Sequence, residues 1–186
     1  MTPSTKRLAA LSAAVALAAL ATLAGCASGP TAPLPTVPAV DLARYTGAWY
    51  EVASLPNRFQ KQCVADTQAR YRQTGADIEV VNRCRTADGQ VDDITGVAKV
   101  VEGSGNAKLR VSFFRPFYGD YWVLALGSGA DYGWVLVGEP TRQFGWVLSR
   151  TPAIAPADME AALARAEALG YARTAFRTTP QTQPLD

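Results

Sequence analysis

The sequence of 186 residues contains no histidine, only three cysteines and almost no net charge. Without histidine there is no histidine-based catalytic triad, no imidazole ligand for a metal and no imidazole that titrates near neutral pH. A formal net charge of +2 lacks the clustered cations that nucleic-acid binding requires. Nucleophile motifs of the GxSxG and SxxK types and glycine-rich phosphate loops are also missing. These absences favour a binding protein without cofactor, metal or nucleic-acid partner.

The first 25 residues have the pattern of an export signal. Two cations, Lys6 and Arg7, precede an apolar stretch over residues 8–23 that is short for a bilayer span. It leads into Leu23-Ala24-Gly25-Cys26, which resembles the lipobox of a bacterial lipoprotein. The resemblance implies cleavage before Cys26 and acyl chains on it, and two or three such chains hold a protein on a membrane essentially permanently. The alternative is an ordinary cleaved signal that leaves Cys26 as a free thiol.

Residues 26–41 are rich in proline and small residues and predict a tether. Such a run favours polyproline II at ~3.1 Å per residue, which gives a spacer of about 40 Å at most. Removal of residues 1–25 leaves sixteen charges of each sign, so charge does not hold the mature chain on anionic lipid. Ala27 replaces the Asp that usually marks retention of such lipoproteins at the inner membrane, which favours a lipid-anchored position at the bacterial outer membrane.

The rest of the chain consists of short strand-like runs separated by turn residues, followed by one helix. The predicted strands are Trp49–Ser54, Val64–Arg72, Ile78–Arg85, Asp93–Val101, Leu109–Phe114, Tyr121–Leu126, Tyr132–Val137 and Phe144–Ser149. The predicted helix has Pro156 near its first turn and Gly170 past its end. Residues 171–176 are a candidate for an extra edge strand.

Eight consecutive antiparallel strands most economically close into an up-and-down barrel, which leaves no unpaired edge. The fold class is therefore all-β, with the helix packed on the outside of the barrel. The alternative is a two-sheet sandwich, which usually needs long crossovers that this chain lacks. An eight-stranded barrel has an interior wide enough for one small ligand. We assign the barrel and helix to residues 42–178 and a C-terminal tail to residues 179–186.

Three spaced motifs resemble the signatures of the lipocalin family. They are Gly47-Ala48-Trp49-Tyr50-Glu51, Asp131-Tyr132 and Arg150. Two longer segments resemble the outer-membrane lipocalins of bacteria and apolipoprotein D, namely residues 112–121 (SFFRPFYGDY) and residues 148–152 (LSRTP). The resemblance covers about residues 42–178. It implies a barrel that binds a lipid such as a fatty acid or a lysophospholipid.

The first and eighth strands meet at the same end of such a barrel, so Trp49 and Arg150 are expected to form its floor by a cation–π contact. Side chains alternate along a strand, which predicts further inward positions on both sides of this pair. The candidate ligand pocket comprises Glu51, Ala53, Phe113, Tyr121, Phe144, Trp146 and Leu148. An enclosed carboxylate needs hydrogen bonds or a proton. Glu51 either orients a ligand headgroup or is satisfied near the floor by Arg150, a tyrosine or water.

The loops at the opposite end are unusually apolar for exposed turns. The candidate mouth residues are Arg58, Phe59, Arg115, Phe117 and Tyr118. The aromatic side chains are suited to a gate, and the two arginines to an anionic headgroup. The alternative is that the aromatic residues only anchor the loops by packing.

Cys63 and Cys84 remain as an even pair once Cys26 is acylated, and an oxidising compartment favours a disulfide between them. A hairpin that turns near Thr74 places the two opposite each other. The rival interpretation is a catalytic or redox-sensing thiol.

Three function classes are consistent with these features. The first is a non-enzymatic binder, store or carrier of lipids in the bacterial envelope. The second is an enzyme on the same scaffold, with Cys63 or Cys84 as nucleophile and Glu51, Asp92 or Asp93 as acid–base group. The third is an interaction protein whose barrel is filled by its own aromatic side chains. The oligomeric state has no sequence signal.

Overall fold

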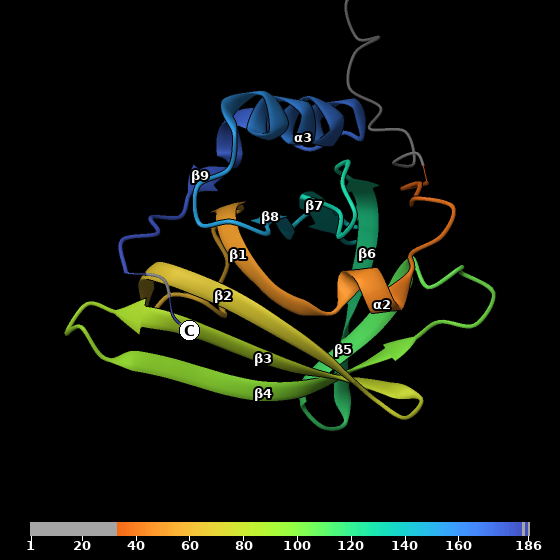
Figure 1. Ribbon diagram of the computed structural model, residues 1–186, viewed down its shortest axis with the longest axis horizontal. Coiled ribbons are helices and arrows are strands. Elements are labelled where there is room, and N and C mark those ends of the chain that lie inside the picture. Colours follow the sequence, from red (N-terminus) through yellow and green to blue (C-terminus); the bar gives the residue numbers. More distant parts are fainter. Residues whose placement is uncertain (1–32, 184, 186) are drawn as a thin grey trace, which may run out of the picture. The chain divides into compact units, whose positions relative to one another are not determined.

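Eight antiparallel strands follow one another around a closed barrel, and a short ninth strand runs beside the first (Figure 1). The computed structural model describes residues 33–183 and residue 185. The strands are β1 Gly47–Ser54, β2 Cys63–Thr74, β3 Asp77–Thr86, β4 Val91–Val100, β5 Lys108–Phe114, β6 Phe117–Leu126, β7 Trp134–Gly138, β8 Gly145–Ser149 and β9 Arg177–Thr178. One half of β1 pairs with β2 and the other with β8, which closes the sheet. The predicted up-and-down barrel is confirmed.

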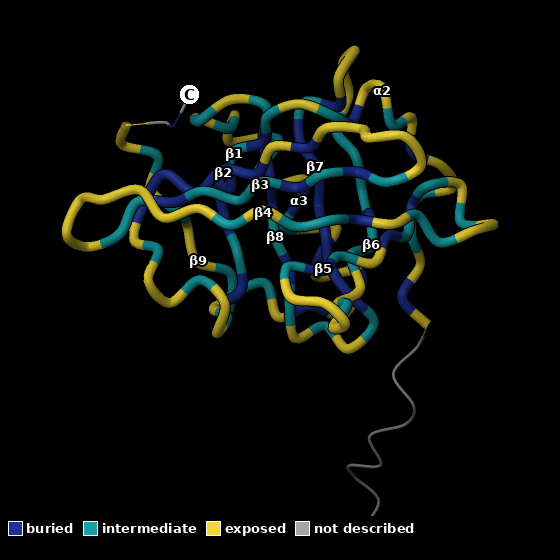
Figure 2. Tube along the Cα trace, turned by 90° about the horizontal axis from the view of Figure 1, so that it is seen from below, coloured by how far each residue is buried: buried dark blue, intermediate teal, exposed yellow. Residues whose placement is uncertain are grey.

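Side chains alternate between the inside and the outside of the barrel with the period of two that a strand imposes. On β7, Val135 and Val137 belong to the inner apolar cluster, whereas Trp134 and Leu136 belong to the outer one. Figure 2 shows that buried positions concentrate in the strands and exposed positions in the turns. The buried members of the inner cluster are Val40, Tyr45, Trp49, Ala69, Tyr71, Ile78, Val80, Ala98, Ala107, Leu109, Val123, Tyr132, Val135, Val137 and Leu148.

Helix α3 (Pro156–Ala168) packs on the outer face of the barrel wall, as predicted (Figure 1). Ala162 and Ala166 are completely buried, in the same cluster as Leu136 of β7. Small residues let the helix approach the sheet closely, and the indole of Trp134 donates a hydrogen bond to Asp158 at 3.2 Å. Within the part of the chain that the structure describes, no helix is long and apolar enough to cross a membrane.

A β-bulge in β1 changes the orientation of one predicted pocket residue, Ala53. Glu51 lies opposite Leu148 of β8, but Ala53 lies opposite Val147, so Val52 is an additional residue in β1. The extra residue reverses the alternation. Ala53 therefore faces outward and joins the cluster beneath α3, and its predicted place inside the barrel is wrong.

The predicted edge strand over residues 171–176 is also wrong. Tyr171 is buried in the outer cluster, and its hydroxyl accepts a hydrogen bond from the amide of Glu139. The chain is therefore attached to the barrel at this point by the Tyr171 side chain rather than by strand pairing. A 3₁₀ turn, η1 (Arg173–Ala175), follows, and pairing with β1 begins only at β9.

The last part of the predicted tether belongs to the folded body. Leu34 and Val40 are buried, and the amides of Val37 and Val40 donate to the carbonyls of Val123 and Gly105. A one-turn helix, α2 (Leu42–Tyr45), then leads into β1, with the Asp41 carboxylate capping its first turn. The tether prediction fails for residues 34–41 because these apolar side chains find partners on the barrel. Residues 1–25 and Cys26 lie outside the described part of the chain.

Candidate ligand-binding site

Arg150 closes one end of the barrel over the indole of Trp49. The guanidinium carbon lies 3.7 Å from the centroid of the indole. The Trp49 side chain is completely buried and donates to the carbonyl of Tyr45 at 2.8 Å. The guanidinium also donates to the backbone carbonyls of Arg44, Tyr45, Ala48 and Asp131. Since these carbonyls belong to α2, the start of β1 and the β6–β7 loop, Arg150 joins three segments at this end.

Three tyrosine hydroxyls meet inside the barrel. Tyr121 lies 2.6 Å from the hydroxyl of Tyr45 and 3.0 Å from that of Tyr71. Burial raises the pKa of Tyr71 to about 12, and burial raises the pKa values of Tyr45 and Tyr121 well above the ordinary value. The three phenols therefore remain neutral at physiological pH, and this layer is polar without carrying charge.

Several inward-facing apolar side chains of the barrel are only partly buried. Val111, Phe113 and Trp146 pack against the inner cluster yet keep part of their surface exposed, as does the predicted pocket residue Tyr121 in the tyrosine layer itself. Leu148, nearer the closed end, is only 4% exposed. Partly exposed inward-facing side chains are thus present on β5 and β8, whereas Trp49 and Leu148 nearer the closed end are buried.

Phe144, a predicted pocket residue, precedes β8. Its ring stacks on Trp146 with centroids 6.2 Å apart and contacts Phe59 at 5.5 Å. Phe144 therefore joins the β1–β2 loop to the lining of the barrel, and belongs to the mouth as much as to the pocket.

The other mouth residues are largely exposed. The exposed fraction is 76% for Phe117, 70% for Phe114 and 60% for Phe59. Tyr118 is half-buried, and the guanidinium carbon of Arg110 lies 5.5 Å from the centroid of its ring. Arg115 is exposed, and Arg58 is exposed and lies 4.9 Å from the ring of Phe59. Phe117 is too exposed to anchor its loop by burial, whereas Phe59 packs on Phe144, and a gate at the mouth stays a prediction.

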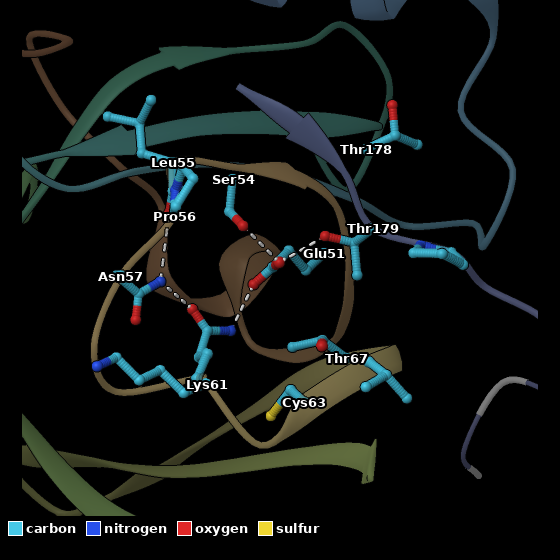
Figure 3. A pocket seen from close by; sticks show the side chains of 13 residues that line it. Glu51, Ser54, Leu55, Pro56, Asn57, Lys61, Cys63, Thr67, Thr178 and Thr179 are labelled. Carbon is cyan, nitrogen blue, oxygen red and sulfur yellow. Dashed lines mark hydrogen bonds between the residues drawn. The ribbon is translucent and has the colours of Figure 1, made fainter. Parts of the chain in front are cut away.

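Glu51 points into a pocket beside the mouth and is satisfied by three neutral groups (Figure 3). It accepts hydrogen bonds from Ser54 at 2.8 Å, from Gln60 at 2.7 Å and from Thr179 at 2.6 Å. The predicted alternatives of Arg150, a tyrosine or water did not include these partners. Gln60 and Thr179 carry no motif in the sequence, and only the bulge in β1 and the course of the C-terminal segment bring them to Glu51.

Cys63 and Cys84 form the predicted disulfide, with Cα atoms 5.5 Å apart. The strand register differs from the prediction. Thr74 pairs with Asp77, which centres the turn about two residues later than a direct pairing of Cys63 with Cys84 needs, and irregularities in β2 between Cys63 and Gln68 offset part of this shift. Cys63 consequently lies opposite Thr86 rather than Cys84. Among the described residues, no group of three or more acidic or cysteine side chains is arranged to hold a metal ion.

The comparisons with known proteins agree with this geometry. A family model described as a lipocalin-like domain matches residues 40–181, and the chain belongs to the lipocalin family. Among solved structures, insecticyanin from the tobacco hornworm Manduca sexta superposes with a TM-score of 0.67 at 19% identity, covering 83% of this chain and 88% of that one. Lobster apocrustacyanin A1 superposes with a TM-score of 0.63 at 15% identity, covering 83% and 93%.

Relatives of higher identity come from plants and bacteria. Temperature-induced lipocalin-1 of Arabidopsis thaliana is 36% identical over 77% of this chain and 80% of its own length. The outer membrane lipoprotein Blc of Escherichia coli K12 is 36% identical over 70% of this chain and 73% of its own length, and Blc of Vibrio cholerae is 38% identical over 61% and 67%. Mouse apolipoprotein D is 35% identical over 62% and 64%.

Proposed function

We propose that this lipocalin binds single-chain lipids, fatty acids or lysophospholipids, and stores or carries them in the bacterial envelope without catalysing a reaction. The acyl chain enters the barrel at the mouth and lies against Val111, Phe113 and Trp146. The observation that carries the proposal is the partial exposure of these inward-facing side chains above a sealed floor. Burial of acyl surface supplies roughly 25 cal/mol per Å², less the cost of ordering the chain.

The proposal includes an N-terminal lipid anchor. Residues 1–25 act as a lipoprotein signal peptide, and Cys26 carries the acyl chains that hold the protein on the outer membrane. The relatives named outer membrane lipoprotein support this placement. Because residues 34–41 pack on the barrel, the proposed spacer between Cys26 and the folded body is limited to residues 27–33.

An enzymatic role on the same scaffold has weaker support. Its candidate nucleophiles, Cys63 and Cys84, are joined in a disulfide and carry no thiolate. Its candidate acid–base group Glu51 is held by three neutral donors, and Asp92 is exposed and accepts from Gln62.

Tryptophan fluorescence tests the binding function. A fatty acid brominated in the middle of its chain should quench the emission of Trp146, which faces the barrel interior. Trp122 faces outward beneath Lys108 and serves as the control. We expect most of the quenching to disappear in Trp146→Phe and to persist in Trp122→Phe. Absence of quenching in the unsubstituted protein, or equal quenching in both variants, would contradict an acyl site in the barrel.

Labelling tests the anchor. Cells that express the full chain should incorporate radiolabelled palmitate into it, and Cys26→Ser should abolish this label and release the protein from the membrane fraction. Membrane association that survives Cys26→Ser would overturn the anchor without affecting the ligand site.

A further inference from the structure

A pocket of about 320 Å³ opens beside the mouth, between the β1–β2 loop, the start of β2 and the C-terminal segment (Figure 3). Thirteen residues line it, and Glu51 is the acidic one among them. Lys61 is the basic one, and the others include polar side chains such as Asn57 and Thr178 and aliphatic ones such as Leu55. The pocket is therefore lined mainly by polar and aliphatic groups around one carboxylate.

The Glu51 carboxylate is buried and hydrogen-bonded by neutral groups. Glu51 is only 5% exposed, and its three hydrogen-bond donors are the neutral side chains of Ser54, Gln60 and Thr179. Within the described residues no lysine or arginine forms an ion pair with it. Buried charges in proteins are normally paired. Oε1 accepts two of the three hydrogen bonds and Oε2 only one, which leaves Oε2 able to accept another.

The chemistry of the lining favours one kind of cation. A quaternary ammonium has no N–H and is usually recognised by a cage of aromatic rings, whereas none of the thirteen lining residues is aromatic. A primary ammonium donates up to three hydrogen bonds and pairs strongly with a carboxylate. Lys61, in the same lining, supplies the positive charge that an adjoining phosphate needs.

Gln60 connects this pocket to the inside of the barrel. Its amide nitrogen donates to Glu51, and its amide oxygen accepts from the Trp146 indole at 3.1 Å and from Asn57 at 2.6 Å. Gln60 is therefore the one side chain between the Glu51 carboxylate and Trp146 in the barrel lining.

We propose that the Glu51 pocket binds the primary ammonium of a phosphoethanolamine headgroup, with Lys61 at its phosphate, while the acyl chain of the same lipid occupies the barrel. The inference rests on the proposed lipid-binding function and specifies the headgroup. It makes the site selective for lysophosphatidylethanolamine over headgroups that lack a primary ammonium.

The first test changes only the ligand. The mature chain with Cys26→Ala, exported behind a cleavable signal, is titrated with three lysophospholipids of one acyl chain. The headgroups are phosphoethanolamine, N-acetylated phosphoethanolamine and phosphocholine. We expect the first to bind roughly tenfold more tightly than the other two, because one charge-assisted pair is lost in each. Equal affinity for all three would overturn the headgroup assignment while leaving the lipid-binding function intact, whereas failure of all three and of a free fatty acid to bind would overturn the function itself.

The second test changes the protein. In Glu51→Gln the tenfold preference should disappear through loss of affinity for the phosphoethanolamine lipid alone. In Lys61→Gln all three lipids should bind several-fold more weakly, whereas Lys99→Gln, which removes a cation that pairs with Asp77 on the barrel wall, should change nothing. An equal loss for every lipid in Glu51→Gln, with the preference retained, would mean that Glu51 only holds the β1–β2 loop in place, and would contradict the assignment.

Discussion

The hydroxyl of Thr179 donates a hydrogen bond of 2.6 Å to Glu51, 128 positions earlier in the chain. The C-terminal segment reaches Glu51 because β1 and β2 pair only over residues 47–50 and 68–71 and diverge towards the mouth. The segment bridges that gap: the amide of Thr179 donates to Val52 and the side chain of Gln181 donates to the carbonyls of Glu51 and Thr67. It is thus part of the barrel wall beside the candidate ligand site.

Asp66 binds the end of the C-terminal segment. Neutralising the Asp66 carboxylate should therefore weaken the attachment of this segment to the barrel. The carboxylate is fully buried and accepts from Arg85 at 2.7 Å and from the amides of Thr182 and Gln183. Burial alone raises the pKa of Asp66, but these hydrogen bonds together outweigh burial and hold the pKa below its ordinary value. A lowered pKa stabilises the fold above the unfolded value of about 3.9, and this stabilisation is lost as the pH falls below it.

Asp66→Asn should therefore lower the free energy of unfolding by about 1–3 kcal/mol at pH 7, and by less at pH 3. Asn tolerates the left-handed backbone of this position (φ 56°), so the substitution adds no backbone strain and removes the charge together with one acceptor oxygen. Urea unfolding measures it, with Glu79→Gln as a control expected to cost less than about 1 kcal/mol, because Glu79 is the half-buried partner of exposed Arg72 in a surface ion pair. Faster hydrogen exchange at the amides of Thr182 and Gln183 should accompany the loss. An unchanged difference between wild type and variant at the two pH values would refute the role of the charge.

Arg150→Lys tests the closed end. Lysine keeps the charge but lacks the planar fork that reaches several carbonyls at once. We expect a loss of about 2–3 kcal/mol in the free energy of unfolding, measured in urea. Arg72→Lys, at an exposed ion pair, should cost less than about 1 kcal/mol. Equal stability of Arg150→Lys and wild type would show that the charge alone seals this end.

The tyrosine layer predicts a loss of stability at alkaline pH. Burial raises the pKa of Tyr71 to about 12, against about 10 for a tyrosine in the unfolded chain. The stabilisation of the neutral phenol is fully present below pH 10 and is lost as the pH rises towards 12. Absorbance of phenolate should show a late ionising class that appears together with unfolding, and Tyr121→Phe should reduce its size. A single ionisation near pH 10 in a folded protein would be the contrary result.

The barrel, its helix, the disulfide and the end at which Trp49 and Arg150 meet are predictable because they depend on periodicity, strand order and residue type. The orientation of Ala53 could not be predicted in this way. A bulge adds one residue to one strand, and nothing in the apolar run Val52-Ala53 indicates that the alternation reverses there.

The hydrogen-bond partners of Glu51 could not be predicted from the sequence either. The segment from Thr179 onwards has no apolar alternation and gives the pattern of a free tail, yet its backbone pairs with β1 and β2. Contacts of this kind depend on the shape of a gap between distant strands rather than on local propensity. The hydrogen-bonding partners Gln60 and Thr179 become apparent only once that gap is known.

The two mouth arginines give a prediction about ligand charge. Arg58 and Arg115 are both exposed beside the apolar rim, so they attract an anionic amphiphile through solvent and lend little to a neutral one. In the double variant Arg58→Gln/Arg115→Gln the affinity for an ionised fatty acid should fall roughly two- to fivefold at low salt, because two exposed cations contribute up to about 1 kcal/mol together. The difference should shrink at high salt. A fatty alcohol of the same chain length should bind both proteins equally, and Arg72→Gln/Arg173→Gln, with both cations in exposed ion pairs elsewhere, should bind both ligands as wild type does. Equal losses for the acid and the alcohol would mean that the substitutions disturb the aromatic rim, and the arginines would then have no part in recognising the headgroup.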